Sequence, residues 1–366
     1  MKLAWIELRR QPGRFALVGS ALALLVLLML FLGQLLDGLF LGSTGAIRVQ
    51  EADSFVFSAE ARESLLRSEV DADQIASIEA IDGVASATGM GISLLGLAVP
   101  GEADGVDGAI AGYETASGRL PAPPAPGEAF ADDALEARGV ELGDTLLVGP
   151  AEVPLKVVAW VEDSNYLLQN GLWVDGETWR QVQNSNRPDA FVADDEWQIA
   201  VVHFDESADA AAVSTAIETQ TGGDALTEEE ASFAIPGVPE QTSTLTAVIY
   251  VTVFVLGLVV ALFFALLTLE RTGLYALLKA TGASNKSLIA GLILQAVVVA
   301  VVAYVLGALL SLLLGAVTPV GIPLEYRYSR ALFVFVAVVV AAIFGGLASL
   351  RRVTRIDPAS AIGAGL

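Results

Sequence analysis

The side chains that most often carry catalysis or bind metals are scarce in this chain. Among its 366 residues there is one histidine and no cysteine. His203 stands in the strand-like segment AVVHFDE. Without a second histidine or any thiol, neither a histidine-based metal cluster nor a cysteine nucleophile can form. No G-x-S-x-G elbow for a serine nucleophile occurs either. We therefore expect a structural role for His203 and find no catalytic constellation.

Two further patterns could suggest ion or phosphate binding. Acidic residues cluster at Asp71 with Asp73, at 194–196 and at 228–230, but none has the spacing of an EF-hand loop. We interpret these clusters as solvated charges at loops and helix starts. The segment GASNKS, from Gly282 to Ser287, lacks the G-x-x-x-x-G-K-S/T spacing of a phosphate loop, and no strand precedes it. We expect no metal site, no cofactor and no ATP hydrolysis by this chain itself.

The elements that would position any site are dominated by apolar segments. The chain is 54% hydrophobic and 17% charged, with a mean hydropathy of +0.62, which is too apolar for an ordinary soluble protein. Four runs reach the roughly 20 residues that cross a hydrocarbon core of about 30 Å. These runs are Phe15 to Leu36, Leu245 to Leu269, Leu288 to Val317 and Ala331 to Leu350.

The distribution of charge predicts how the apolar runs cross the membrane. From Leu41 to Thr242 there are 37 acidic and 8 basic residues, a net charge of −29, whereas the rest of the chain has a net charge of +7. The basic residues beside the apolar runs mark the cytoplasmic side by the positive-inside rule. They are Lys2, Arg9, Arg10, Arg14, Arg271, Lys279, Lys286, Arg351, Arg352 and Arg355. Both termini are then cytoplasmic and the acidic segment is outside. Arg327 and Arg330, in a short outer turn, are the basic residues that do not follow this rule. Strong acidity outside also argues against nucleic acid as a partner.

The first ten residues, MKLAWIELRR, predict a short amphipathic helix at the membrane interface. Pro12 and Gly13 separate it from the first apolar run. A signal peptide is the alternative, but the run is longer than a usual h-region and no A-x-A site follows it. We expect a retained anchor.

The acidic segment alternates helix and strand patterns, which favours mixed sheets with helices on one face. A helix from Asp71 onward is ended by Gly83, and a second helix, Asp132 to Arg138, is ended by Gly139. Strands are predicted for VASATGM, for Thr145 to Val148 and for VPLKVVAWVED. A further strand, WQIAVVHF, leads to a last helix. The apolar residues expected to face inward on these helices are Ile75, Ile78, Ala212 and Ile217.

These patterns predict an α-helical membrane protein with four transmembrane helices and a large α/β extracytoplasmic domain inserted between helices 1 and 2. The predicted segments are a cytoplasmic interfacial helix (1–14), the first transmembrane helix with a stalk (15–40), the extracytoplasmic domain (41–243), the second transmembrane helix (244–269), a cytoplasmic coupling loop (270–286), the third transmembrane helix (287–317), an external turn (318–330), the fourth transmembrane helix (331–350) and a cytoplasmic tail (351–366).

The apolar runs themselves contain few polar residues. Gln295 is the clearest polar residue within a run, and we expect no buried acid, base or histidine relay of the kind that proton-coupled transporters use. Glycines in these runs allow close contacts between helices. They are Gly257, Gly291, Gly307, Gly315, Gly345 and Gly346.

Two cytoplasmic segments resemble a known family. LERTGLYALLKATGASNKSLIAGLILQA together with LRRVTRIDPASAI resembles the FtsX-like domain of ABC transporter permeases, the MacB, LolC and FtsX group. The acidic segment is similar to the MacB-type extracytoplasmic domain in IEAIDGVASA, in SGRLPAPPAPGEAFADDALEARGVELGDTLLVG and in LKVVAWVEDS.

The resemblance implies a permease subunit, a homodimer or a heterodimer with a second permease, in the bacterial cytoplasmic membrane. Because the chain has no Walker motif, a separate ABC ATPase subunit would bind ATP and Mg. Closure of that ATPase would be transmitted mechanically through the membrane helices to the outer domain. The outer domain would export or extract a lipoprotein, peptide, lipid or drug, or control an outer partner, with or without an extracytoplasmic adaptor.

The resemblance also suggests where the ATPase docks. Leu274, Leu277 and Leu278 are spaced i, i+3 and i+4 and form an apolar stripe that must pack against another surface. Gly282 can end this helix, and Ser284 can cap the next one. A helix lying flat on the membrane is the alternative to a coupling helix in an ATPase groove. The predicted ATPase contacts are Glu270, Arg271, Leu274, Tyr275, Leu277, Leu278, Lys279 and Gly282. A second cytoplasmic contact is predicted at Arg351, Arg352, Arg355, Asp357 and Pro358, although ordinary helix termination explains the same residues.

Another class of function remains open from sequence alone. An ATP-independent membrane receptor or adhesion protein could use the acidic domain only to bind a ligand. Such a receptor needs no leucine-striped cytoplasmic loop between apolar runs, so this loop favours the permease. A membrane-bound hydrolase is disfavoured because nucleophile and metal sites are missing.

Overall fold

The structure is a computed structural model that describes residues 12–100, 105–270, 273, 277, 281, 284–319 and 321–348. It divides into two compact units. The first, the membrane unit, comprises 1–38 and 242–366, and the second, the outer unit, comprises 39–241. The boundaries fall inside two continuous helices, so two helices belong to both units.

Four described helices are long and apolar enough to cross a membrane. They are α2 (Pro12–Arg48), α7 (Val238–Glu270), α9 (Asn285–Val317) and α10 (Tyr328–Ala348). The prediction of four apolar helices is therefore confirmed. All four helices extend beyond the predicted runs: α2 continues to Arg48, α7 begins at Val238, α9 begins at Asn285, and α10 begins at Tyr328 inside the predicted outer turn.

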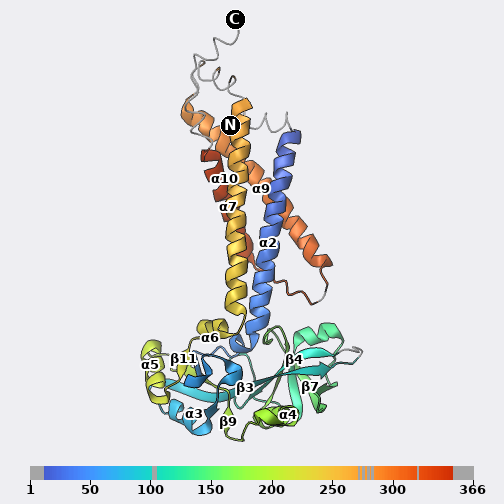
Figure 1. The fold of residues 1–366 in the computed structure, drawn as a ribbon, viewed down its shortest axis with the longest axis vertical. Coiled ribbons are helices and arrows are strands. Elements are labelled where there is room, and N and C mark those ends of the chain that lie inside the picture. Colours follow the sequence, from blue (N-terminus) through green and yellow to red (C-terminus); the bar gives the residue numbers. More distant parts are fainter. Residues whose placement is uncertain are drawn as a thin grey trace. The chain divides into compact units, whose positions relative to one another are not determined.

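Small residues bring the helices of the membrane unit close together. Ala303, Gly307 and Ser311 form one buried stripe on α9, where a Cβ atom on Gly307 would lie only 2.7 Å from the carbonyl oxygen of Ala23 in α2. Figure 1 shows α9 crossing α2 while α10 runs beside α7. This is the small-residue packing expected between helices in lipid.

The glycine predictions are confirmed only in part. A Cβ atom on Gly345 would lie 2.7 Å from the carbonyl oxygen of Gly257, so α10 and α7 do approach closely there, as α9 and α2 do at Gly307. Gly315 makes only an ordinary contact, 3.8 Å from Gln34 Oε1. Gly291 has no neighbour within 4 Å, so its predicted close contact is wrong. Gly346 lies among residues whose side chains the structure does not describe.

The outer unit is built on a nine-stranded mixed sheet with the order β11-β1-β10-β3-β4-β8-β5-β7-β6. The strands are β1 (Ser54–Phe57), β3 (Val84–Ala98), β4 (Val106–Tyr113), β5 (Glu128–Asp132), β6 (Thr145–Val148), β7 (Val153–Val161), β8 (Asn170–Asp175), β10 (Ile199–Phe204) and β11 (Asp224–Leu226). A separate small sheet pairs β2 (Val70–Asp71) with β9 (Glu196–Trp197). The pairs β4–β8 and β5–β7 are parallel, which confirms the predicted mixed sheet.

Strand β3 joins two parts of the sheet because it is 15 residues long. Its first half pairs with β10, and its second half pairs with β4. Its last residues also pair with β6, through Leu97 with Val148, so that β3, β4, β8, β5, β7 and β6 close into a ring of strands. The sequence predicted only VASATGM as a strand, because the glycines beyond it weaken a β pattern.

Helices cover both faces of the sheet in the outer unit. One face packs on α3 (Ala72–Glu79), α4 (Gly176–Asn186) and α5 (Ala210–Thr221). The other face packs on α6 (Glu228–Ala234) and on the end of α2 (Figure 1). The prediction of helices on one face is therefore wrong, because the end of the first long helix folds into the outer unit. Short 3-10 helices, η1 (Ala59–Ala61), η2 (Leu65–Arg67), η3 (Asp133–Arg138) and η4 (Pro188–Ala190), complete the described elements.

Two stacked tryptophans fill the face under α4. The rings of Trp179 and Trp197 are parallel with centroids 5.5 Å apart, and both side chains are buried. The strand glycines Gly89 and Gly91 lie directly beneath these rings, where a Cβ atom would overlap Trp197 and Trp179 respectively. Glycine in β3 is therefore required by the packing of aromatic rings on the sheet.

The local predictions of helix ends agree with the structure only in part, because α3 ends at Glu79 and the predicted end at Gly83 is wrong. Asp71 caps α3 in a capping box with Gln74, and Gly139 ends η3 in the left-handed conformation. Segment 133–138 is a 3-10 helix rather than an α-helix. Ile75, Ile78 and Ile217 are buried as predicted, but Ala212 is exposed and its neighbour Val213 is buried instead, a phase error of one residue.

Candidate functional site

The predicted coupling loop begins where α7 ends and stops where α9 begins. Glu270 is the last residue of α7, and the Ser284 side chain accepts a hydrogen bond of 3.2 Å from the Ser287 amide, which confirms Ser284 as the cap of α9. Leu277 is helical and 58% exposed. The other predicted contacts, Arg271, Leu274, Tyr275, Leu278, Lys279, Gly282, Arg351, Arg352, Arg355, Asp357 and Pro358, lie outside the described residues.

Polar residues at the end of the apolar run of α2 join three elements of the membrane unit. Asp37, 5% exposed, forms a two-point ion pair with Arg330 of α10, with Nε–Oδ2 and Nη2–Oδ1 distances of 3.0 and 2.5 Å. One turn earlier, Gln34 Nε2 donates a 3.0 Å hydrogen bond to the buried Ser311 Oγ of α9. The expectation of no buried acid is therefore wrong, because Asp37 is buried with a cation.

Sequence reasoning missed Asp37, although a signal for it existed. Arg330 is a basic residue on the predicted outer side, against the positive-inside rule, and Asp37 follows the first apolar run at that same predicted side. A lone positive charge there conflicts with the charge pattern, whereas a buried pair of opposite charges does not. Gln295 is also buried, as its place within the third run suggested.

The outer unit holds the end of α2 through the loop between β7 and β8. The Leu168 amide donates to the Gly42 carbonyl at 2.9 Å, and the Ala46 amide donates to the Asn165 carbonyl at 2.9 Å. Gly45 makes this possible, because a Cβ atom there would lie 2.7 Å from the Asn165 nitrogen. The backbone of this loop thus hydrogen-bonds directly to the backbone of the helix.

Buried polar side chains keep that loop in place. Asp132, fully buried, accepts hydrogen bonds of 2.8 Å from both the amide and the hydroxyl of Ser164. Leu167 and Leu168 both have positive φ, at 52° and 64°. Consecutive leucines in the left-handed region are unfavourable by themselves, so the contacts with α2 and Asp132 hold a strained backbone.

A cluster of charges surrounds the last residue of α2. Arg48 pairs with Asp163 with both N–O distances at 2.5 Å, and Arg119 lies 3.7 Å from the same carboxylate. Glu228, at the start of α6, faces this cluster; burial raises its pKa although Arg48 and Arg119 lower it. The cluster therefore lies beside the end of α2 and the start of α6, the helix that precedes α7 in the chain.

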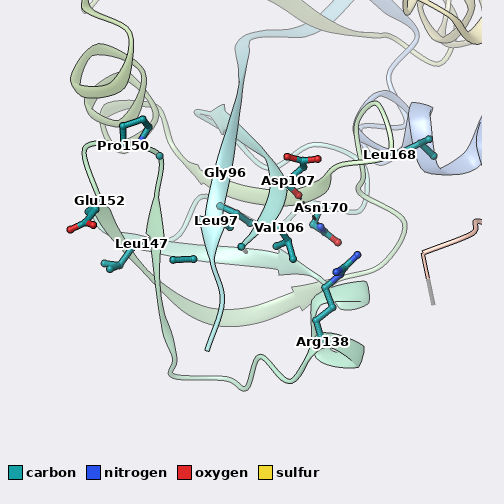
Figure 2. Close-up of a pocket in the computed structure, with 13 residues that line it drawn as sticks. Gly96, Leu97, Val106, Asp107, Arg138, Leu147, Pro150, Glu152, Leu168 and Asn170 are labelled. Atoms are coloured by element: carbon teal, nitrogen blue, oxygen red, sulfur yellow. Dashed lines mark hydrogen bonds between the residues drawn. The ribbon is translucent and has the colours of Figure 1, made fainter. Parts of the chain in front are cut away.

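An open cleft of about 830 Å³ lies at the end of the strand ring. Figure 2 shows Arg138, Asp107 and Asn170 on one side of Leu97, with Glu152 on the other. The Asn170 side chain donates to the Asp107 carbonyl at 2.9 Å, so this amide supports the wall of the cleft. Its described lining residues mix one basic, two acidic and several apolar side chains, and none of these is a nucleophile with a base beside it. Such walls can bind a molecule that has both polar and apolar groups.

His203 has a structural contact. Its Nε2 lies 2.8 Å from Ser117 Oγ, which also donates to the Gln50 carbonyl at 3.2 Å. Ser117 is 4% exposed and His203 is partly buried, so this contact links β10 to the segment that follows α2. Within the described parts of the chain, no group of three histidine or acidic residues could hold a metal ion.

Comparison with known proteins finds a family match in the last third of the chain. Residues 246–358 match the family described as FtsX-like permease C-terminal. A Staphylococcus haemolyticus protein, provisionally named hemin transport system permease protein HrtB, is 30% identical over 139 residues, which cover 38% of each chain. An uncharacterised ABC transporter permease of Mycobacterium tuberculosis is 41% identical over 109 residues, 30% of this chain and 31% of that protein.

Longer but weaker matches extend into the outer unit. A Staphylococcus epidermidis protein with the same provisional name, HrtB, is 24% identical over 234 residues, 64% of this chain and 63% of the relative. The chain therefore spans between about a third and two thirds of the length of these relatives. Among solved structures, the extracellular domain of YknZ (TM-score 0.33, 11% identity) covers 48% of this chain and 99% of its own. The periplasmic region of MacB from Actinobacillus actinomycetemcomitans (TM-score 0.36, 12% identity) covers 52% of this chain and 94% of its own.

The helices α7, α9 and α10 and the segments between them coincide with the matched region. Four apolar helices and an α/β unit between the first and second confirm the predicted fold class. The chain is thus a multi-pass membrane protein whose residues 246–358 match the FtsX-like permease family.

Proposed function

We propose that this chain is the permease subunit of an ABC transporter that works with a separate ATPase subunit. The observation that carries the proposal is the match of residues 246–358 to the FtsX-like permease domain, in a chain whose relatives include proteins named ABC transporter permeases. ATP hydrolysis on the partner chain would act at residues 270–286, and two permease subunits, identical or different, would pair in the cytoplasmic membrane with both termini inside the cell.

The two helices shared by both units would carry the motion outward. α2 and α7 are continuous from apolar segments into residues that pack in the core of the outer unit, such as Ile47 and Val238. A continuous helix transmits displacement along its axis because its backbone hydrogen bonds are internal. Closure of the ATPase would therefore move the outer unit mechanically. The outer unit would export or extract a substrate, or control an outer partner, directly or through an adaptor.

The substrate is open within this proposal. Two relatives are named for hemin transport, which makes hemin a first compound to test. The acidic outer unit and its cleft are compatible with other small molecules or peptides as well, since the cleft has both apolar and charged walls.

The test is to express the chain with candidate ABC ATPases, reconstitute each pair in lipid nanodiscs and measure ATP hydrolysis. We expect one ATPase to bind and to be stimulated. The double variant Arg271→Glu with Leu278→Asp should stay in the membrane but lose that ATPase. The matched control is Arg62→Glu with Leu142→Asp, two exposed positions of the outer unit, which should retain it.

Two results would overturn the proposal in different ways. If the Arg271 and Leu278 variant stimulates the ATPase as well as the unchanged chain, the docking segment is wrong. If no ATPase binds the unchanged chain while the outer unit binds a ligand without ATP, the chain is a receptor or adhesion protein instead.

A further inference from the structure

Four residues of α2 form a polar and small face at the end of its apolar run. Gly33, Gln34, Asp37 and Gly38 are spaced i, i+1, i+4 and i+5, which places them on one side of the helix. All four are buried. A Cβ atom on Gly33 would lie 3.0 Å from the Arg330 side chain, and one on Gly38 would overlap the Pro323 carbonyl. The glycines therefore let the outer turn and α10 approach α2 closely.

This face makes one specific bond to each of three neighbouring segments. Gln34 binds Ser311 of α9 through its side chain, and its carbonyl accepts a 3.0 Å hydrogen bond from the Glu325 amide in the outer turn. Asp37 binds Arg330 at the start of α10. Elsewhere the membrane unit is held mainly by apolar and small residues, which define the neighbours of a helix better than they define its register.

The contacts specify the register of α2. Sliding α2 by one helical turn, about 5.4 Å, would separate both side-chain pairs and leave a carboxylate and a guanidinium without partners. Leaving a buried charge unpaired is far more costly than keeping the pair, even where the pair adds little net stability. Two-point geometry also restricts the angle between the two side chains.

From these contacts we infer that Asp37 and Arg330 are positioning residues. Their ion pair holds α2 against α10, so that α2, α9 and α10 keep one register while motion passes along α2. The inference deepens the proposed function, on which the ATP-driven part of the motion rests. It implies that the transport cycle moves these three helices together and does not slide α2 past α9.

The pair itself is tested without any ATPase. Asp37→Asn, Arg330→Gln and the double variant are reconstituted in nanodiscs, and their thermal unfolding is followed. We expect each single variant to unfold at a lower temperature and the double variant to be no worse than the poorer single one, because the two residues act on each other. The exchange Asp37→Arg with Arg330→Asp should recover part of the loss. Additive losses without recovery would overturn the pair as a positioning device.

The register is tested by cross-linking. The chain has no cysteine, so Gln34→Cys with Ser311→Cys introduces its only thiols, at two side chains now in contact. A short, reducible bis-methanethiosulfonate reagent joins α2 to α9 in the complex with the stimulated ATPase. We expect the linked complex to keep at least about half of its stimulated ATP hydrolysis and transport. If linkage stops both and reduction restores them, α2 must slide past α9 and the inference is wrong.

The coupling readout separates positioning from simple stability. In the complex, Asp37→Asn should lower transport per ATP hydrolysed by roughly tenfold, a size typical of coupling between sites, while ATPase binding is unchanged. If Asp37 only stabilised the fold, the variant would lose transport and ATPase binding together, in proportion to the fraction of protein that is unfolded. If the unchanged chain stimulates no ATPase, the proposed function fails, and the unfolding cycle alone still decides whether Asp37 and Arg330 act as a pair.

Discussion

The guanidinium of Arg48, the last residue of α2, binds both carboxylate oxygens of Asp163 at 2.5 Å. The side chains are 17% and 36% exposed, so water weakens the pair without separating it. Arg48 also donates to the Leu41 carbonyl at 3.0 Å. One side chain therefore ties the end of the helix to the loop that hydrogen-bonds with its backbone.

Replacing Arg48 should weaken the contact that holds the end of α2 to Asp163. We expect Arg48→Lys to destabilise the outer unit by about 1 kcal/mol, since lysine cannot make the two-point contact and the pair is partly exposed to water. Four of the five tryptophans, at 160, 173, 179 and 197, belong to this unit, so tryptophan fluorescence during thermal unfolding reports it. Arg62→Lys, at an exposed position, is the control and should leave the midpoint unchanged. An equal drop of the unfolding midpoint in both variants would mean that the two-point contact of Arg48 does not stabilise the outer unit.

Glu228 should make stability depend on pH. Burial raises its pKa in the fold from the ordinary value of 4.5, so the folded chain holds the proton more tightly than the unfolded one. The resulting stabilisation is fully present below pH 4.5 and is lost as pH rises through the raised pKa. Glu228→Gln should therefore be more stable than the unchanged chain at neutral pH, with no such gain near pH 4.

The check is urea unfolding at several pH values, with Glu229→Gln as the control from the exposed side of the same turn. A gain that is the same for Glu228→Gln at every pH would show that the carboxylate does not titrate in this way.

Gly91 should not tolerate a side chain. Its Cβ atom would overlap the buried ring of Trp179, and overpacking of this kind costs about 1–3 kcal/mol. Gly91→Ala should therefore lower the unfolding midpoint of the outer unit. Gly96→Ala, in the same strand and with nothing within 4 Å, is the matched control. Similar midpoints for both variants would contradict the packing of the rings on the strand.

Gly307 should be equally sensitive in the membrane unit. A Cβ atom there would meet the Ala23 carbonyl and Val26 at 2.7 Å, so Gly307→Ala must push α9 away from α2, at a cost of about 1–3 kcal/mol. Gly291→Ala, in the same helix with open space around it, should be harmless. Retention of monodisperse protein after heating in nanodiscs measures the difference, and equal retention would argue against close contact at Gly307.

Features that depend on nearby residues could be predicted from the sequence. Hydropathy sufficed for the four long helices because a span needs only a run of apolar side chains. Caps such as Asp71, Gly139 and Ser284 were readable because a cap acts within a few residues of itself. The coupling-loop contacts other than the cap at Ser284 stay predictions.

Which distant residues meet could not be predicted without the folded structure. Asp37 and Arg330 are 293 positions apart, and Gln34 and Ser311 are 277 apart. No local pattern links them, since their pairing depends on how α2, α9 and α10 cross. Likewise, the closing of the strands through Leu97 and Val148 and the need for glycine at Gly91 follow from contacts between separate elements. Burial then changes the role of a residue: Asp37, at the end of the apolar run of α2, becomes a contact that holds two helices together.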